Sequence, residues 1–149
     1  MIPRYARAEM ARIWAPEAKY EAWLQVELAV CDVYAKRGLI PEDALRRIKG
    51  RARVSAGRID EIEATTRHDV IAFLTNLEEA LGADSRYVHM GLTSSDVVDT
   101  ALALQLQQAS DLLLAGLERY RDALRTLALR HREDRKSTRL NSSHLFISR

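Results

Sequence analysis

Cysteine, proline and glycine are scarce in this chain, which has one cysteine, three prolines and six glycines in 149 residues. The single Cys31 cannot form an internal disulfide, which is typical of a reducing compartment, and its small size favours a buried position. Few prolines and glycines leave room for long helices. Net charge is also small, because 23 Lys and Arg are balanced by 21 Asp and Glu. A basic nucleic-acid-binding domain is therefore excluded.

Long hydrophobic runs are absent as well. No apolar stretch approaches the roughly 20 residues that cross a bilayer, and charges at Arg4, Arg7, Glu9 and Arg12 interrupt any signal-peptide core. Hydrophobic residues nevertheless make up 47% of the chain, which is enough for one domain with a core. We expect a soluble cytoplasmic protein with no membrane partner and no nucleic-acid partner.

Apolar residues recur at steps of three and four, which predicts an all-α fold. A small N-terminal helical domain is expected over residues 1–93, with helices over about 16–37, 42–49, 59–64 and 70–81. Pro16 suits the start of the first helix, and Gly38, Gly50 and Gly82 suit the ends of three of them. The first helix carries an apolar stripe that we interpret as core packing and not as a cofactor box; it consists of Tyr20, Trp23, Leu24, Leu28, Cys31 and Tyr34.

One much longer helix is predicted from about residue 95 to 132. Its leucines follow a heptad-like pattern, and about 36 residues at about 1.5 Å each give roughly 54 Å. A helix of this length buries its apolar side only against other long helices. We expect residues 94–133 to be the first long helix of a central helical bundle, with partners from other subunits or from sequence outside this chain. The pattern stops after Glu133, so residues 134–149 are expected to be a non-native tail.

Residues 87–100 combine a histidine, a glycine, hydroxyls and carboxylates immediately before the long helix. The types of Thr93, Ser94, Ser95 and Asp96 all suit an N-cap. The free N–H groups and the dipole of a helix N-terminus suit an anion. A well-capped helix start without any ligand fits the same pattern.

Two other short segments carry candidate binding chemistry. Arg67 and His68 offer a cation and an imidazole, and Asp69 can cap the helix that follows; the alternative is a capping carboxylate beside a hydrogen-bonded loop histidine. Arg4 is a fork of donors that suits phosphate, and Tyr5 adds a hydroxyl and a flat face. The alternative for this pair is a surface contact that docks the terminus.

The segment His89-Met90-Gly91-Leu92-Thr93-Ser94-Ser95-Asp96-Val97, followed by Asp99-Thr100, resembles a conserved block of the fumarase/aspartase superfamily. Together with the two other segments it resembles the adenylosuccinate lyase family most closely. Those lyases cleave adenylosuccinate to AMP and fumarate, and cleave the succinylated carboxamide intermediate (SAICAR) to AICAR in purine biosynthesis. The resemblance implies substrate contacts by Arg4, Tyr5, Arg67, His68, Asp69, Thr93 and Ser94, with His89 and Ser95 as further possible contacts.

The same resemblance covers residues 1–133 and implies that this chain is the N-terminal fragment of a longer enzyme. It places the acid His of a Gly-Arg-Thr-His-Gly segment and a base Ser beyond this chain, so we assign no catalytic residue and expect no turnover from the chain alone. The sequence contains no metal-ligand spacing and no Gly-rich phosphate loop, so we expect no cofactor and no metal. The resemblance implies a homotetramer for the full-length enzyme. The alternatives are another superfamily member such as a carboxymuconate cycloisomerase, which shares a His-x-Gly-x-Thr-Ser-x-Asp block, and a non-catalytic helical oligomerisation module.

Overall fold

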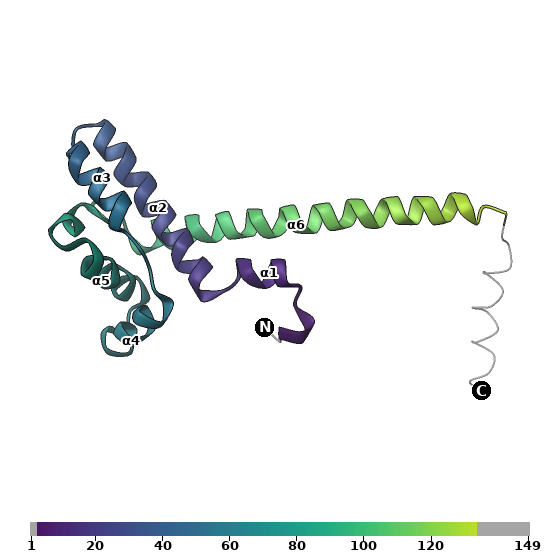
Figure 1. The fold of residues 1–149 in the computed structure, drawn as a ribbon, viewed down its shortest axis with the longest axis horizontal. Helices are drawn as coiled ribbons and strands as arrows, with labels where there is room; N and C mark the ends of the chain where they lie inside the picture. Colours follow the sequence, from purple (N-terminus) through teal and green to yellow (C-terminus); the bar gives the residue numbers. More distant parts are fainter. Residues whose placement is uncertain (1–2, 134–149) are drawn as a thin grey trace. The chain divides into compact units, whose positions relative to one another are not determined.

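The computed structural model describes residues 3–133, and the tail expected over 134–149 lies outside them. Within the described residues there are α-helices and 3-10 helices and no strand, so the predicted all-α class is confirmed. Figure 1 shows the elements in chain order: η1 (Pro3–Tyr5), α1 (Ala8–Ile13), α2 (Pro16–Lys36), α3 (Glu42–Arg51), α4 (Ala56–Thr66), α5 (Asp69–Leu81), η2 (Gly82–Tyr87) and α6 (Ser94–Arg130).

The predicted helix boundaries hold best where a backbone requirement marks them. Pro16 lies in the first turn of α2, while Gly38 and Gly82 follow α2 and α5 with φ of 74° and 59°. Left-handed backbone of this kind favours glycine. Gly50 was wrongly predicted to end α3, which continues through it to Arg51. A single glycine is tolerated inside a helix, and Gly50 has no positive φ.

Two helices differ more from the prediction. Helix α1 was not predicted, and its six residues include none that is buried. The predicted helix over 59–64 starts earlier, because Ser55 caps α4 and its side chain accepts the N–H of Arg58 at 3.5 Å. Ser55 is followed by Ala56 and Gly57, whose small size gives this first turn little apolar periodicity to mark it.

The chain separates into two compact units, Met1–Ser110 and Asp111–Arg149. The core of the first unit centres on three aromatic rings from α2 and α5. Trp23 lies edge-on to Tyr20 and Phe73 with centroid distances of 5.3 and 5.4 Å, and all three rings are almost fully buried. Each such aromatic contact contributes about 0.5–1.5 kcal/mol beyond burial. The aromatic stripe of α2 is therefore core packing, as predicted.

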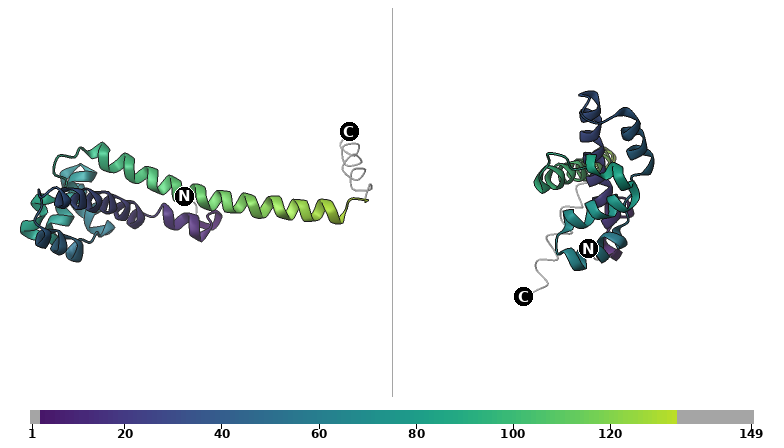
Figure 2. Two further views of the ribbon diagram at one scale, coloured as in Figure 1. Left: turned by 90° about the horizontal axis from the view of Figure 1, so that it is seen from above. Right: turned by 90° about the vertical axis from the view of Figure 1, so that its left-hand side faces the viewer.

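Helices α4 and α5 lie side by side (Figures 1 and 2), and Ile59 of α4 and Phe73 of α5 belong to the same buried cluster. A second, smaller cluster joins α2 and α3 through Cys31, Ile40 and Ala44. Burial raises the pKa of the Cys31 thiol to about 11, with the charges of Glu27 and Asp32 adding to the effect. Cys31 is thus a buried, unreactive thiol, as its size suggested.

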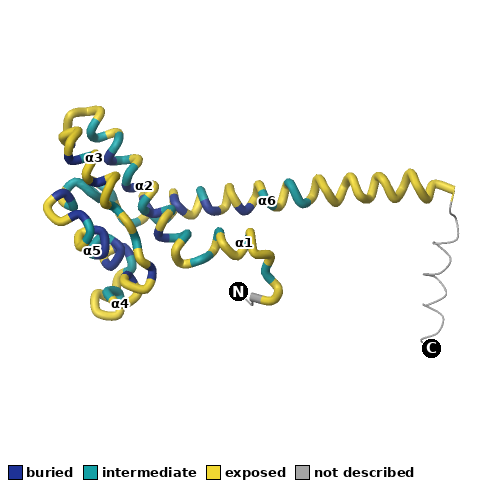
Figure 3. The backbone as a smooth tube through the Cα atoms, viewed as in Figure 1, coloured by how far each residue is buried: buried dark blue, intermediate teal, exposed yellow. Residues whose placement is uncertain are grey.

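Helix α6 has two parts that differ in burial, as Figure 3 shows by the change from blue to yellow along it. Its first part belongs to the first unit and buries Val97, Ala101, Gln105 and Ala109. The unit boundary after Ser110 thus lies inside α6, whereas the sequence placed a domain boundary at residue 93. In the second unit Leu112 of α6 is half-buried, whereas seven other large apolar side chains of the helix are 47–66% exposed; they are Leu113, Leu114, Leu117, Tyr120, Leu124, Leu127 and Leu129.

Candidate functional site

The turn before α6 is held against α2 by a buried carboxylate. Glu27 is 1% exposed; its Oε1 lies 2.6 Å from His89 Nδ1, and its Oε2 accepts the His89 backbone N–H at 2.8 Å. His89 has a φ of 60°, a left-handed conformation that is unusual for a non-glycine residue. Such strain persists only where surrounding contacts over-determine it. The two bonds from Glu27 supply that constraint.

Gly91 completes this turn because no other residue fits its place without cost. Its φ is 72°, and a Cβ built on it would meet the Tyr34 hydroxyl at 3.2 Å. The flanking Val88 and Met90 pack on the small cluster of α2 and α3. The turn is therefore held both by the bonds from Glu27 and by packing on this smaller cluster before α6 begins.

The Asp96 side chain folds back onto Thr93 at the start of α6. The Asp96 carboxylate accepts the Thr93 N–H at 2.8 Å and the Thr93 hydroxyl at 3.1 Å. These bonds to the Thr93 N–H and hydroxyl hold the pKa of Asp96 below its ordinary value, with the nearby His89 adding to the effect. Ser94 and Ser95 make no side-chain hydrogen bond within residues 3–133. Their hydroxyls are the uncommitted polar groups of this helix start.

The segment around His68 caps α5 with a different residue from the one predicted. Arg67 ends α4 with a left-handed φ of 56°, and its side chain is exposed. His68, and not Asp69, is the N-cap of α5: its Nδ1 accepts the Ile71 N–H at 3.3 Å. Because Nδ1 accepts, the proton of the neutral ring sits on Nε2. The Asp69 carboxylate instead accepts the adjacent Val70 N–H at 2.8 Å.

Two charged residues of α2 contact these segments, although neither was predicted as a site residue. Lys19 Nζ lies 4.0 Å from the Asp69 carboxylate and 4.6 Å from the centre of the Trp23 ring. Glu27 holds His89, as described above. Glu27 could have been found, because it falls on the apolar face of α2 between Trp23 and Cys31, where a carboxylate needs a partner. Lys19 gave no comparable signal.

The spacing of Lys19 and Glu27 along α2 gives the separation between the segment of His68 and the turn of His89. Lys19 and Glu27 are eight residues apart, which corresponds to about 12 Å along a helix. The segment of His68 lies beside Lys19, and the turn of His89 lies beside Glu27. No hydrogen bond or ion pair joins them in the described part of the chain. The structure thus attaches both segments to one helix, two turns apart, without bringing them into contact.

The third candidate pair stays by itself. Arg4 donates to the Tyr5 hydroxyl at 3.0 Å, and its guanidinium lies 4.9 Å from the centre of the Tyr5 ring. Tyr5 is 72% exposed. Among the described residues, no hydrogen bond or ion pair joins this pair to the segments of His68 or Thr93. Both side chains are free to meet a ligand.

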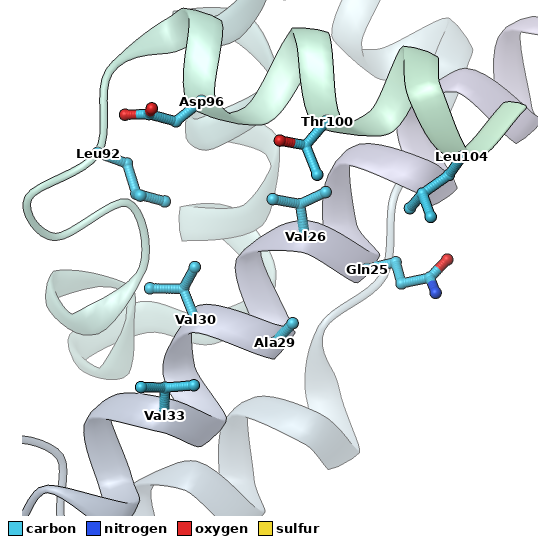
Figure 4. A pocket seen from close by; sticks show the side chains of 9 residues that line it. All are labelled: Gln25, Val26, Ala29, Val30, Val33, Leu92, Asp96, Thr100 and Leu104. Carbon is cyan, nitrogen blue, oxygen red and sulfur yellow. The ribbon is translucent and has the colours of Figure 1, made fainter. Parts of the chain in front are cut away.

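An apolar groove of about 640 Å³ lies between α2 and the start of α6, within the first unit. Figure 4 shows its side chains: valines of α2 on one wall, with Leu92, Thr100 and Leu104 on the other. Asp96 is the only charged residue that lines it among those described. The groove suits an apolar surface better than a phosphorylated ligand.

Between residues 3 and 133 no three His, Cys, Asp or Glu side chains are grouped so that they could hold a metal ion. The helices of that same range include none that is both long and apolar enough to cross a bilayer.

Comparison with known proteins gives consistent matches. A family model described as a lyase matches residues 4–139. Adenylosuccinate lyases from Synechocystis sp. and Bacillus subtilis are 52% and 46% identical over 132 residues, which is 89% of this chain. A third adenylosuccinate lyase, from Staphylococcus saprophyticus, is 47% identical over 124 residues, which is 83% of this chain. The chain spans about a third of the length of these curated relatives, 29–31%.

Two solved structures share the fold. A fumarate lyase from Mesorhizobium sp. matches with a TM-score of 0.78 at 26% identity, and covers 85% of this chain with 31% of its own. A 3-carboxy-cis,cis-muconate lactonizing enzyme from Pseudomonas putida matches with a TM-score of 0.77 at 31% identity, and covers 85% of this chain with 30% of its own.

Proposed function

The chain belongs to the lyase family, and on that premise we propose that it forms the substrate-binding front part of an adenylosuccinate lyase. The reaction is β-elimination of fumarate, from adenylosuccinate to give AMP and from SAICAR to give AICAR. The observation that carries the proposal is the 46–52% identity to adenylosuccinate lyases over most of the chain, against 31% to the muconate enzyme. The higher identity favours the nucleotide substrate over the carboxymuconate alternative.

The start of α6 supports binding of the succinyl carboxylates. Asp96 already occupies the N–H of Thr93, so an incoming carboxylate has the hydroxyls of Ser94 and Ser95 and the free N–H groups of the first helical turn. The Thr93 hydroxyl joins them only by turning away from Asp96. These groups would stabilise charge that builds on the carboxylates as the proton leaves the adjacent carbon.

The start of α5 supports contacts elsewhere on the nucleotide. His68 uses Nδ1 to cap its helix, so Nε2–H is the donor that it can offer to a ligand. Arg67 is exposed beside it, and the nearby Lys19 partly neutralises Asp69. A cation and an N–H donor next to each other suit a phosphate. Arg4 and Tyr5 are proposed to add nucleotide contacts when a ligand brings the segments together.

The exposed apolar side of α6 supports assembly. Leu113, Leu117, Leu124 and Leu127 follow the heptad pattern and are 47–62% exposed in the second unit. We assign this side to packing against other long helices in a homotetramer of the full-length enzyme. The same exposure is the observation that favours the alternative of a non-catalytic oligomerisation module. We propose a cytoplasmic location for the enzyme.

Ligand binding separates the lyase proposal from the oligomerisation module. Isothermal titration of the purified chain with adenylosuccinate should show binding that Ser94→Ala and His68→Ala weaken, because the first removes a proposed contact to the succinyl carboxylates and the second a proposed contact to the nucleotide. Thr126→Ala in the second unit is the matched control and should leave binding unchanged. A fumarate-release assay of the chain alone should show no turnover, since the sequence contains no Gly-Arg-Thr-His-Gly segment. Absence of adenylosuccinate binding, or equal binding by all variants, would contradict the proposal.

A further inference from the structure

Glu27 is an ionisable side chain in the middle of an apolar helix face. It is 1% exposed, and Trp23 and Cys31, one turn away on either side, are equally buried. A buried carboxylate is costly unless it is paired and hydrogen-bonded. Both of its oxygens are used, and both contact the same residue, His89, which lies 62 positions later in the chain. Its bonds are therefore directed at one turn only.

An ionised carboxylate only accepts hydrogen bonds. His89 Nδ1, at 2.6 Å from Oε1, must then carry a proton whether the ring is neutral or charged. Nε2 lies on the opposite edge of the ring and is directed away from Glu27. We propose that Glu27 is a positioning residue that holds His89 with Nδ1 protonated and Nε2 turned to the substrate. The role of Nε2 toward substrate rests on the proposed function, whereas the role of Glu27 toward the ring does not.

The second bond of Glu27 acts on the backbone. Oε2 accepts the His89 N–H at 2.8 Å, and His89 has the left-handed φ of 60°. One carboxylate thereby fixes the ring state and the main-chain direction four residues before Thr93. The other candidate histidine, His68, is held in the opposite way, because its Nδ1 accepts a backbone N–H. The two histidines thus have complementary tautomers: His68 offers Nε2–H, and neutral His89 offers a bare Nε2.

Nitrogen NMR of the histidine rings tests this role directly. In the ¹⁵N-labelled chain, with His89 assigned through its side-chain correlations, Nδ1 should give the frequency of a protonated nitrogen. Glu27→Gln should reverse this. The amide oxygen then accepts the backbone N–H and the amide NH₂ faces Nδ1, so the neutral ring must carry its proton on Nε2. The expected result is an exchange of the protonated and unprotonated ¹⁵N frequencies between the two ring nitrogens.

Asp84→Asn is the matched control. Asp84 is also a buried carboxylate, 8% exposed, but its two oxygens accept from Arg47 and not from a histidine. The His89 ring should keep its wild-type frequencies in this variant even though a buried pair is lost. A purely structural role of Glu27 would let both variants behave alike.

The wild-type spectrum alone can overturn the inference, even if Glu27→Gln does not fold. An unprotonated Nδ1 in wild type would show that the carboxyl group is the donor and that the proposed ring state is wrong. Unchanged ring frequencies in folded Glu27→Gln would overturn it as well. Addition of adenylosuccinate tests the other proposal separately: a shift confined to Nε2 is expected. No shift, with Nδ1 protonated, would overturn nucleotide binding while supporting the role of Glu27.

Discussion

Gly91→Ala is expected to destabilise the first unit, because the turn before α6 needs a residue without a side chain. Two features of the structure set the size of the effect. The φ of 72° lies in the left-handed region, where a non-glycine residue costs roughly 1–2 kcal/mol. The new Cβ would also meet the Tyr34 hydroxyl at 3.2 Å. Tyr34 is half-buried and can shift, so this contact adds at most about 1 kcal/mol, the low end of overpacking costs.

An opposing effect comes from the unfolded chain, which loses conformational freedom when glycine becomes alanine. That effect is about 0.4–1 kcal/mol, so the net loss should be about 1–2 kcal/mol out of a typical 5–15 kcal/mol. Urea unfolding followed by tryptophan fluorescence measures it, since Trp23 is buried in the same unit. The slope of the transition should not change if only the native state is affected.

Two further variants identify the cause. Gly50→Ala is the matched control: Gly50 lies inside α3, without positive φ and with no atom near a new Cβ. The same substitution there should stabilise by about 0.5–1 kcal/mol. Adding Tyr34→Phe to Gly91→Ala should recover only the contact part of the loss. A Gly91→Ala chain as stable as wild type would refute the assignment of a left-handed turn at this position.

Two other predictions concern the ends of α6 and α1. The pKa of Asp96 is lowered by its bonds to Thr93. The stabilising effect of Asp96 should therefore be complete above its ordinary pKa of about 3.9 and be lost as pH falls through the lower pKa of the folded state. Asp96→Asn should remove this acid dependence of stability, measured by thermal melts between pH 2 and 6, a range of about two units either side of the ordinary pKa. Gln105 of α6 is 6% exposed and donates to the Ile13 carbonyl at the end of α1 at 2.6 Å. Gln105→Ala should weaken the attachment of α1 to α6 by about 1 kcal/mol. Amide hydrogen exchange should become faster in Ala8–Ile13, while exchange in α5 stays unchanged.

Much of the fold followed from local patterns in the sequence. The helices α2, α5 and α6 are long and periodic, and each is set by neighbours three and four residues away, which sequence spacing records directly. The shorter α1 and the true start of α4 were missed, because their few residues carry little periodicity. Candidate segments at Arg67–Asp69 and Thr93–Ser95 could be selected for the same local reason: each lies at the start of a helix.

The roles of individual residues within those segments could be assigned only from the backbone angles of the structure. Asp69 was the better N-cap by type, yet His68 caps α5, because the backbone at His68 is extended and brings Nδ1 to the Ile71 N–H. Residue type states what a side chain can accept, whereas the backbone angles decide which of two adjacent acceptors reaches the helix.

Helical class, the apolar face of α2 and the positions of the polar segments are properties of short windows, and reading the chain residue by residue was enough to obtain them. The pairing of Glu27 with His89, the contact of Gly91 with Tyr34 and the bond from Gln105 to Ile13 join residues that are 57 to 92 positions apart or lie in separate elements. Such contacts form only when packing of the aromatic core brings distant helices together, and burial then makes each unpaired polar group costly. For this reason the state of the His89 ring could be inferred only from the folded molecule.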